Sequence, residues 1–127
     1  DRCALPTEQI RAADALLFVT PEYNYSMSGV LKNAIDWASR PPEQPFAGKP
    51  AALMGASAGR FGTVRAQYHL RQSMVFLDVR LLNRPEVMIA NAQNAFDQHG
   101  KLIDELIREH VRGLLSALHD WTLALGR

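Results

Sequence analysis

Three short apolar segments alternate with helical segments along the chain, and this alternation constrains the fold more than any other feature. Apolar runs at 15–19, 51–55 and 86–90 are each followed by a stretch with helical periodicity. The first run, ALLFV, contains no polar residue, which is typical of a parallel strand covered on both faces. Strand–helix alternation predicts parallel strands joined by right-handed crossovers, and therefore an α/β fold.

The helical segments can be placed from their periodicity and their end signals. A short helical piece is expected at 7–13, ahead of the first strand. The next helix is expected to be capped by Ser26 or Ser28 and to stop before a Pro-Pro pair. Segments 63–79 and 102–125 carry apolar residues at helical spacing, so each is expected to form a helix.

Composition narrows the classes of function. The formal net charge is +1, which gives no electrostatic reason to expect nucleic acid or an anionic membrane as a partner. No apolar run approaches the ~18 residues of a membrane-spanning helix. The only cysteine, Cys3, is interpreted as an ordinary thiol, and such cysteine usage suits a reducing cytoplasm. Because no repeat or linker interrupts the sequence, residues 1–127 are expected to form a single domain.

Two loops at the expected strand ends have an unusual composition. The first, PEYNYS at 21–26, places two tyrosines, a carboxylate and an amide where a plain turn needs only small residues. The second, GASAGRFG at 55–62, is rich in small residues that let backbone N–H groups approach a ligand. Either loop alone is explained equally well as a tight connection or a cover for the core edge. Since ligands of open parallel sheets bind at the carboxyl ends of strands, the two loops together predict a slot for a flat, polar-edged ring.

Other motifs give little indication of a catalytic or metal site. It has no GxGxxG, Walker, HExxH or CxxC motif. The histidines at 69, 99, 110 and 119 lack the spacing of metal ligands and are interpreted as surface or core-edge residues. Ser57 lies within GASAG, which has the GxSxG spacing of a hydrolase nucleophile, but a hydrolase interpretation is weak. We therefore expect no metal site and assign no catalytic side chain.

The same segments resemble the NAD(P)H-dependent FMN reductases, including the bacterial quinone and chromate reductases. TPEYNYSMSGVLKNAIDWASR is similar to the family's most recognisable block, and the similarity continues through GKPAALMGASAGRFGTVRAQYHLRQSMVFLDVRLLNRPEV and FDQHGKLIDE. It covers the chain from about residue 10 onward. The resemblance implies a flavodoxin-like, doubly wound parallel sheet in the order 2-1-3-4-5 with bound FMN. This chain would contain the C-terminal three strands of that sheet and their flanking helices.

The resemblance also implies which residues bind the cofactor. They are Pro21, Glu22, Tyr23, Asn24, Tyr25, Ser57, Gly59 and Arg60. The residues of the first loop would lie along the isoalloxazine ring, partly through their backbone, with Pro21 stiffening the turn. Ser57, Gly59 and Arg60 would line the other side of the slot. Backbone N–H groups would stabilise the anionic reduced flavin, and Glu22 is interpreted as a positioning residue.

The activity implied by the resemblance is an oxidoreductase reaction. Hydride would pass from NADPH or NADH to FMN, and two electrons would then pass to a small-molecule acceptor such as a quinone, a metal oxyanion, an azo dye or free flavin. Members of the family are homodimers or homotetramers. Trp37 is accordingly a candidate interface residue or, alternatively, a core residue, and Arg65, Tyr68 and Glu86 could pair between subunits.

In the family, a first strand, a phosphate-binding loop, a helix and a second strand come before the residues that open this sequence. A strand–helix–strand unit needs roughly 30 residues, whereas only about fourteen precede the first expected strand. We therefore expect an N-terminally incomplete domain with an exposed sheet edge. FMN binding should be weak or absent if the polypeptide begins at Asp1.

Two other functions stay open at this point. One is a flavodoxin-type electron carrier, which the net charge of +1 disfavours because such carriers are usually strongly acidic. The other is a non-catalytic flavodoxin-like fragment that binds its cofactor poorly.

Overall fold

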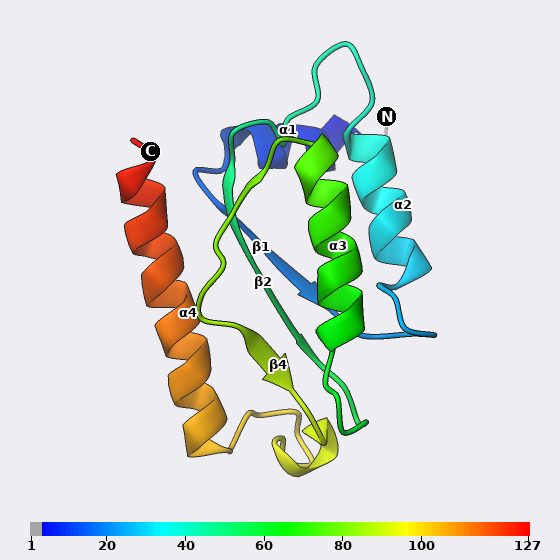
Figure 1. The fold of residues 1–127 in the computed structure, drawn as a ribbon, viewed down its shortest axis with the longest axis vertical. Coiled ribbons are helices and arrows are strands. Elements are labelled where there is room, and N and C mark those ends of the chain that lie inside the picture. Colours follow the sequence, from blue (N-terminus) through cyan, green and yellow to red (C-terminus); the bar gives the residue numbers. More distant parts are fainter. Residues whose placement is uncertain (1–3) are drawn as a thin grey trace.

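The computed structural model describes residues 4–127, in which helices lie on both faces of a parallel sheet (Figure 1). Cys3 lies outside the described residues. The elements are α1 (Ala4–Ala12), β1 (Leu16–Thr20), α2 (Gly29–Ala38), β2 (Pro50–Ala56), α3 (Val64–Phe76), β3 (Arg80–Leu81), β4 (Val87–Ile89), the 3-10 helix η1 (Ala92–Asn94) and α4 (Glu105–Ala124). This order confirms the predicted α/β fold.

Strand β2 is the centre of the sheet. All of strand β1 pairs with β2 in parallel, from Leu16 opposite Ala51 to Thr20 opposite Gly55. On the other side of β2, strand β3 pairs with the beginning of β2 and strand β4 pairs with the end of β2. Both pairings are parallel. The short strand β3 was not predicted, but β3 and β4 together occupy one position, so the three expected strand positions are present. Among residues 4–127, no strand pairs with the outer edge of β1.

The side chains of β2 alternate between two cores. Ala51 and Leu53 pack with buried residues of α2 and α3, whereas Ala52 packs with buried residues of β4 and α4. A strand of small and apolar residues can therefore be covered on both faces, as its sequence indicates. Figure 1 shows α2 and α3 on one side of the sheet and α4 on the other.

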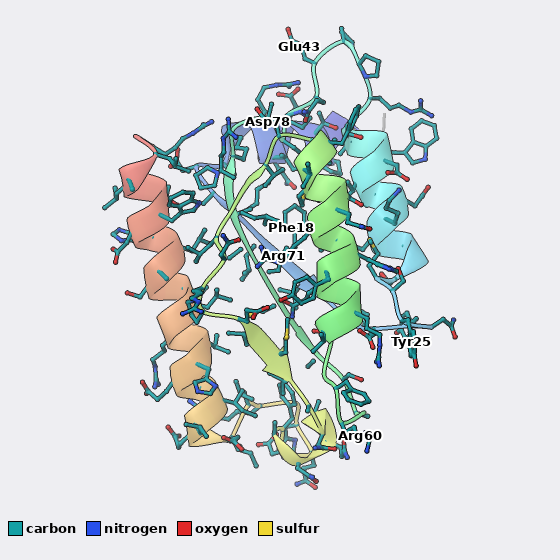
Figure 2. All side chains as sticks on the ribbon, in the orientation of Figure 1. Phe18, Tyr25, Glu43, Arg60, Arg71 and Asp78 are labelled. Atoms are coloured by element: carbon teal, nitrogen blue, oxygen red, sulfur yellow. The ribbon has the colours of Figure 1, made fainter. Side chains whose placement is uncertain are left out.

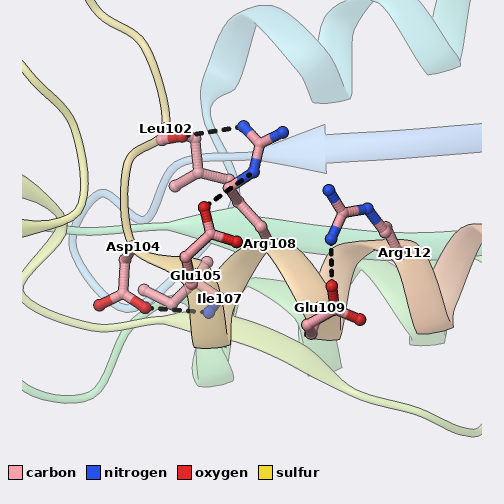
Figure 3. Close-up of polar contacts among 7 residues, drawn as sticks. All are labelled: Leu102, Asp104, Glu105, Ile107, Arg108, Glu109 and Arg112. Carbon is pink, nitrogen blue, oxygen red and sulfur yellow. Dashed lines mark hydrogen bonds and ion pairs between the residues drawn. The ribbon is translucent and has the colours of Figure 1, made fainter.

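Three helices differ from the sequence-based expectation. Helix α1 was expected at 7–13 but spans Ala4–Ala12. Helix α3 was expected to reach residue 79 but ends at Phe76, because Asp78 adopts a left-handed φ of 58° that ends the helical path. Helix α4 was expected to begin at residue 102 but begins at Glu105, because Asp104 is its N-cap. Figure 3 shows the Asp104 carboxylate accepting a hydrogen bond from the backbone N–H of Ile107, at 3.0 Å.

Helix α2 begins as predicted, with one of the two candidate serines as its cap. Ser28 Oγ accepts a hydrogen bond from the backbone N–H of Leu31 at 3.1 Å. Trp37, further along α2, is 54% exposed, so the alternative that it is a core residue is wrong. None of the helices within residues 4–127 has both the length and the apolar character needed to cross a membrane.

Candidate functional site

The two unusual loops leave the sheet side by side. Parallel pairing puts Thr20, the last residue of β1, opposite Gly55 near the end of β2. The segment after β1 and the segment after β2 therefore start at the same edge, as the sequence predicted. The exit of β4 joins them there, because Ile89 pairs with Ala56.

The first loop is a tight reverse turn that exposes two aromatic rings. Tyr23 N–H donates to the Ser26 carbonyl at 2.9 Å, and Ser26 N–H donates to the Tyr23 carbonyl at 3.0 Å. The two central residues, Asn24 and Tyr25, both have positive φ, 51° and 68°, the pattern of a type I′ turn. Tyr23 and Tyr25 are 60% and 65% exposed. The turn therefore holds both rings out toward solvent instead of using them to cover the core.

Glu22 points away from solvent and binds the beginning of α3. Its Oε1 accepts a hydrogen bond from the backbone N–H of Ala66 at 2.8 Å, and its side chain is only 11% exposed. The N-cap residue Thr63 makes no capping bond of its own, because its hydroxyl accepts from Gln67 Nε2 at 2.9 Å. A carboxylate from the first loop thus supplies the acceptor that the helix N-terminus requires.

The second loop is shaped by its own hydrogen bonds and by glycine. Ser57 Oγ accepts from the Gly59 N–H at 3.1 Å, and the Ser57 N–H donates to the Ile89 carbonyl at 2.9 Å. The loop is also bound to the exit of β4, since Asn91 N–H donates to the Gly59 carbonyl at 3.1 Å. Gly62 has a φ of 60°, and a Cβ there would lie 3.1 Å from a backbone atom of Met88. Only glycine fits this bend without strain.

A row of stacked side chains joins the two loops. The Arg65 guanidinium carbon lies 3.9 Å from the ring centroid of Tyr25 in the first loop and 4.8 Å from that of Phe61 in the second. Arg65 also approaches Glu22 Oε2 at 3.9 Å. One turn later on α3, His69 Nδ1 is 3.0 Å from Ser26 Oγ. The beginning of α3 is therefore the common support of both loops.

The sequence-predicted residues all lie at this edge, but they do not all present side chains to it. Glu22 faces α3 and Ser57 bonds within its own loop, whereas Arg60 is exposed. Sequence reasoning missed Phe61 and the loop contact of His69. The available signal was the spacing of Arg65 and His69, four apart and therefore on one face of α3.

The polar residues suggested to pair between subunits also make contacts within the chain. Tyr68 Oη donates to Glu86 Oε2 at 2.9 Å, and this carboxylate raises the pKa of Tyr68 above its ordinary value. Arg65 is occupied by the two aromatic rings. Within residues 4–127, no three His, Cys, Asp or Glu side chains gather into a set that could hold a metal ion.

Comparison with known proteins decides the family. The model of the NADPH-dependent FMN reductase family matches residues 2–94. The chain belongs to this family. The match includes both loops and the beginning of α3.

Individual members of the family are similar over most of the chain. An NAD(P)H-dependent FMN reductase of Pseudomonas aeruginosa is 74% identical over 93% of this chain and 64% of its own length. A quinone reductase of Escherichia coli K12 is 52% identical over 90% of this chain and 61% of its own length. The chain thus spans about three fifths of the length of these FMN reductase family relatives.

A solved structure supports the same fold. The flavoenzyme NAD(P)H:(acceptor) oxidoreductase of Paracoccus denitrificans has a TM-score of 0.87 and 36% identity, covering 98% of this chain and 69% of that one. An oxidoreductase of Corynebacterium diphtheriae has a TM-score of 0.73 at 14% identity, which shows the shared fold alone. The flavodoxin-like fold of this FMN reductase family member is thereby confirmed.

Proposed function

We propose that the protein is an FMN-dependent NAD(P)H oxidoreductase that passes hydride from NADPH or NADH through FMN to a quinone, a metal oxyanion or free flavin. The relatives named as FMN reductase, quinone reductase and 2-hydroxy-1,4-benzoquinone reductase support this proposal. The observation that carries it is the pair of loops at the carboxyl edge of β1 and β2, which α3 holds together through Glu22 and Arg65.

The groups exposed at this edge fit a flavin. Tyr23 and Tyr25 supply flat aromatic surface. The backbone N–H groups of Asn24, Arg60 and Phe61 make no hydrogen bond within the part of the chain that the structure describes. Aromatic surface with a few free backbone donors is what binding sites for planar, polar-edged molecules provide. Free N–H groups also favour an anion, such as the reduced flavin.

Each predicted residue has a place in this proposal. FMN, when bound, supplies the acceptance of hydride and the release of electrons to a second substrate. The residues that we propose to form its site are Pro21, Glu22, Tyr23, Asn24, Tyr25, Ser57, Gly59 and Arg60. Glu22 and Ser57 would hold the loops in shape, and the tyrosines and free N–H groups would contact the ring. We assign no side chain as an acid or base.

The proposal extends to assembly and location. A homodimer or homotetramer is supported by large apolar side chains that α2 and α3 leave exposed, including Trp37 and Phe76, the latter 91% exposed. A sequence with one cysteine fits a reducing cytoplasm.

Three measurements on the purified protein test the function. Its absorption spectrum should contain flavin bands, FMN fluorescence should be quenched on titration, and NADPH should be oxidised when a benzoquinone is added. A protein that binds FMN but does not oxidise NADPH with the quinone would be an electron carrier instead. A colourless protein that takes up no FMN and oxidises no NADPH contradicts the proposal.

A further inference from the structure

Arg60 is an exposed cation without a carboxylate partner. No Asp or Glu oxygen lies within 4.0 Å of its guanidinium among the described residues, whereas Arg80 and Arg112 both pair with acidic side chains. Its guanidinium carbon lies 4.7 Å from the ring centroid of Phe61, which is itself 48% exposed. The ring restricts the positions of the cation and leaves its N–H donors available.

A second arginine shares the same ring. The Arg65 guanidinium carbon is 4.8 Å from the Phe61 centroid, so Phe61 contacts two cations. The only acidic side chain of the described residues that pairs with either arginine is Glu22, at 3.9 Å from Arg65. That carboxylate is already bonded to the Ala66 N–H. Two arginines therefore face one carboxylate here, and the net positive charge that remains favours an anionic ligand.

These cations lie at the edge where the flavin loops meet. Arg60 lies in the loop that follows β2, and Figure 2 shows Arg60 and Tyr25 toward the same end of the molecule. Of the substrates in the proposed reaction, the nicotinamide dinucleotide carries phosphate groups in every turnover. The acceptor is anionic only in some cases, such as a metal oxyanion, and a simple quinone carries no charge. Arginine binds phosphate oxygens through paired N–H donors.

We propose that Arg60, supported by Phe61 and Arg65, binds a phosphate group of the nicotinamide co-substrate. This inference rests on the proposed function and adds the residue that recognises the dinucleotide. The shared chemistry is a phosphate ester, which is either the pyrophosphate of NADH and NADPH or the 2′-phosphate that only NADPH carries. Arg60 contributes affinity for the co-substrate and has no part in hydride transfer.

The test compares Arg60→Gln with a matched control, Arg40→Gln. Arg40 is also exposed and lies 5.4 Å from an aromatic centroid, that of Trp37, but it follows α2. Both variants remove one charge and one cation–π contact from the surface. Loss of a charge-assisted hydrogen bond predicts a KM for NADPH raised about 10-fold in Arg60→Gln. KM should change less than about two-fold in Arg40→Gln, with kcat and the Kd for FMN unchanged in that control.

The arms of the experiment distinguish the two phosphates. An equal rise of KM for NADPH and NADH supports contact with the pyrophosphate, and a rise for NADPH alone supports contact with the 2′-phosphate. An unchanged KM for both dinucleotides overturns the inference. A change confined to the KM of the quinone, or to the Kd of FMN, overturns it as well.

Direct binding separates this inference from the proposed function. Calorimetric titration with NADP⁺ and NAD⁺ measures dinucleotide affinity without turnover, and Arg60→Gln should weaken it about as much as it raises KM. If the wild-type protein oxidises no NADPH, the proposed function fails, and the titration still decides the inference. Binding of neither dinucleotide by the wild type, or equal binding by wild type and Arg60→Gln, overturns it.

Discussion

The carboxylate of Glu22 accepts a hydrogen bond from the backbone N–H of Ala66, a residue 44 positions later in the chain. This bond fixes the loop after β1 to the first turn of α3, whose own N-cap residue, Thr63, provides no side-chain cap. A residue that belongs by sequence to a candidate binding loop therefore also completes a helix. Loop geometry and helix stability should consequently change together when Glu22 is altered.

Glu22→Ala should lower the free energy of unfolding by about 1–2 kcal/mol, as loss of a helix cap does. Glu22→Gln keeps a carbonyl oxygen that can accept the same bond, so its loss should be smaller. Urea denaturation measures both, and FMN titration should show weaker binding in the alanine variant because the tyrosine turn is no longer held.

The control for this prediction is Glu43→Ala. Glu43 is exposed and lies in the loop at the other end of the molecule (Figure 2), where its Oε2 is 3.9 Å from Arg11 Nη2. Exposed pairs of this kind contribute between zero and about 1 kcal/mol. If Glu22→Ala is no more destabilising than Glu43→Ala, the capping role of Glu22 is wrong.

Gly55→Ala and Gly113→Ala should change stability in opposite directions. A Cβ on Gly55 would lie 2.3 Å from the Thr20 carbonyl oxygen and from Thr63 Oγ1, so β1, β2 and the start of α3 would have to move apart. Overpacking of this kind costs about 1–3 kcal/mol or more. Gly113, within α4, has nothing within 4 Å, so alanine there should stabilise by up to about 1 kcal/mol. Thermal unfolding measured by circular dichroism distinguishes the two; a Gly55→Ala variant as stable as wild type would contradict the first expectation.

The sequence predicted the three strand positions and the edge that carries the loops, because both follow from local patterns. Apolar runs such as ALLFV identify strands covered on both faces, and parallel strands bring their carboxyl ends to one edge. The boundaries were less accurate where one residue decided them. The left-handed Asp78 ends α3 early, and β3 has only two residues, too few for any periodicity.

The contacts between the loops could not be predicted in the same way. Whether Glu22 faces a ligand or a helix depends on the direction of its side chain relative to an element far along the chain. The stack of Arg65 on Tyr25 and Phe61 likewise requires three segments in their final places. Spacing identifies which residues share a helix face, but it does not identify what that face meets.

Lys49 should make the stability of the protein depend on pH in the alkaline range. Its Nζ donates to the carbonyl of Arg11, in the last turn of α1, and to that of Ala13, just after this helix. Burial, followed by repulsion from Arg127, lowers the pKa of Lys49 below its ordinary 10.5, although Asp14 opposes this. The folded state then binds the proton less tightly than the unfolded state, so the contribution of Lys49 is largest above pH 10.5 and falls as pH drops through the lowered pKa.

Lys49→Met lacks the titrating group and isolates this effect. The variant should be less stable than wild type, by about 1–3 kcal/mol, because two carbonyls lose their donor. The stability difference between wild type and variant should be larger at pH 10.5 than at pH 7, measured by urea unfolding at each pH. A difference that is constant, or that shrinks as pH rises, would be evidence against the lowered pKa.

Glu86→Gln should lower the pKa of Tyr68 toward 10.0. The Glu86 carboxylate accepts the phenol hydrogen bond and carries a negative charge, and both favour the protonated phenol; burial acts in the same direction, and Arg71 opposes them. Glutamine can still accept the bond, so the part of the shift that is lost measures the effect of the charge, and the part that remains measures the hydrogen bond and burial. Because the folded-state pKa is raised, the stabilisation is complete below pH 10 and is lost as pH rises through that pKa. Absorbance at the phenolate band reports the titration, with Tyr68→Phe identifying the Tyr68 component; an unchanged titration in Glu86→Gln would show that the carboxylate does not raise the pKa.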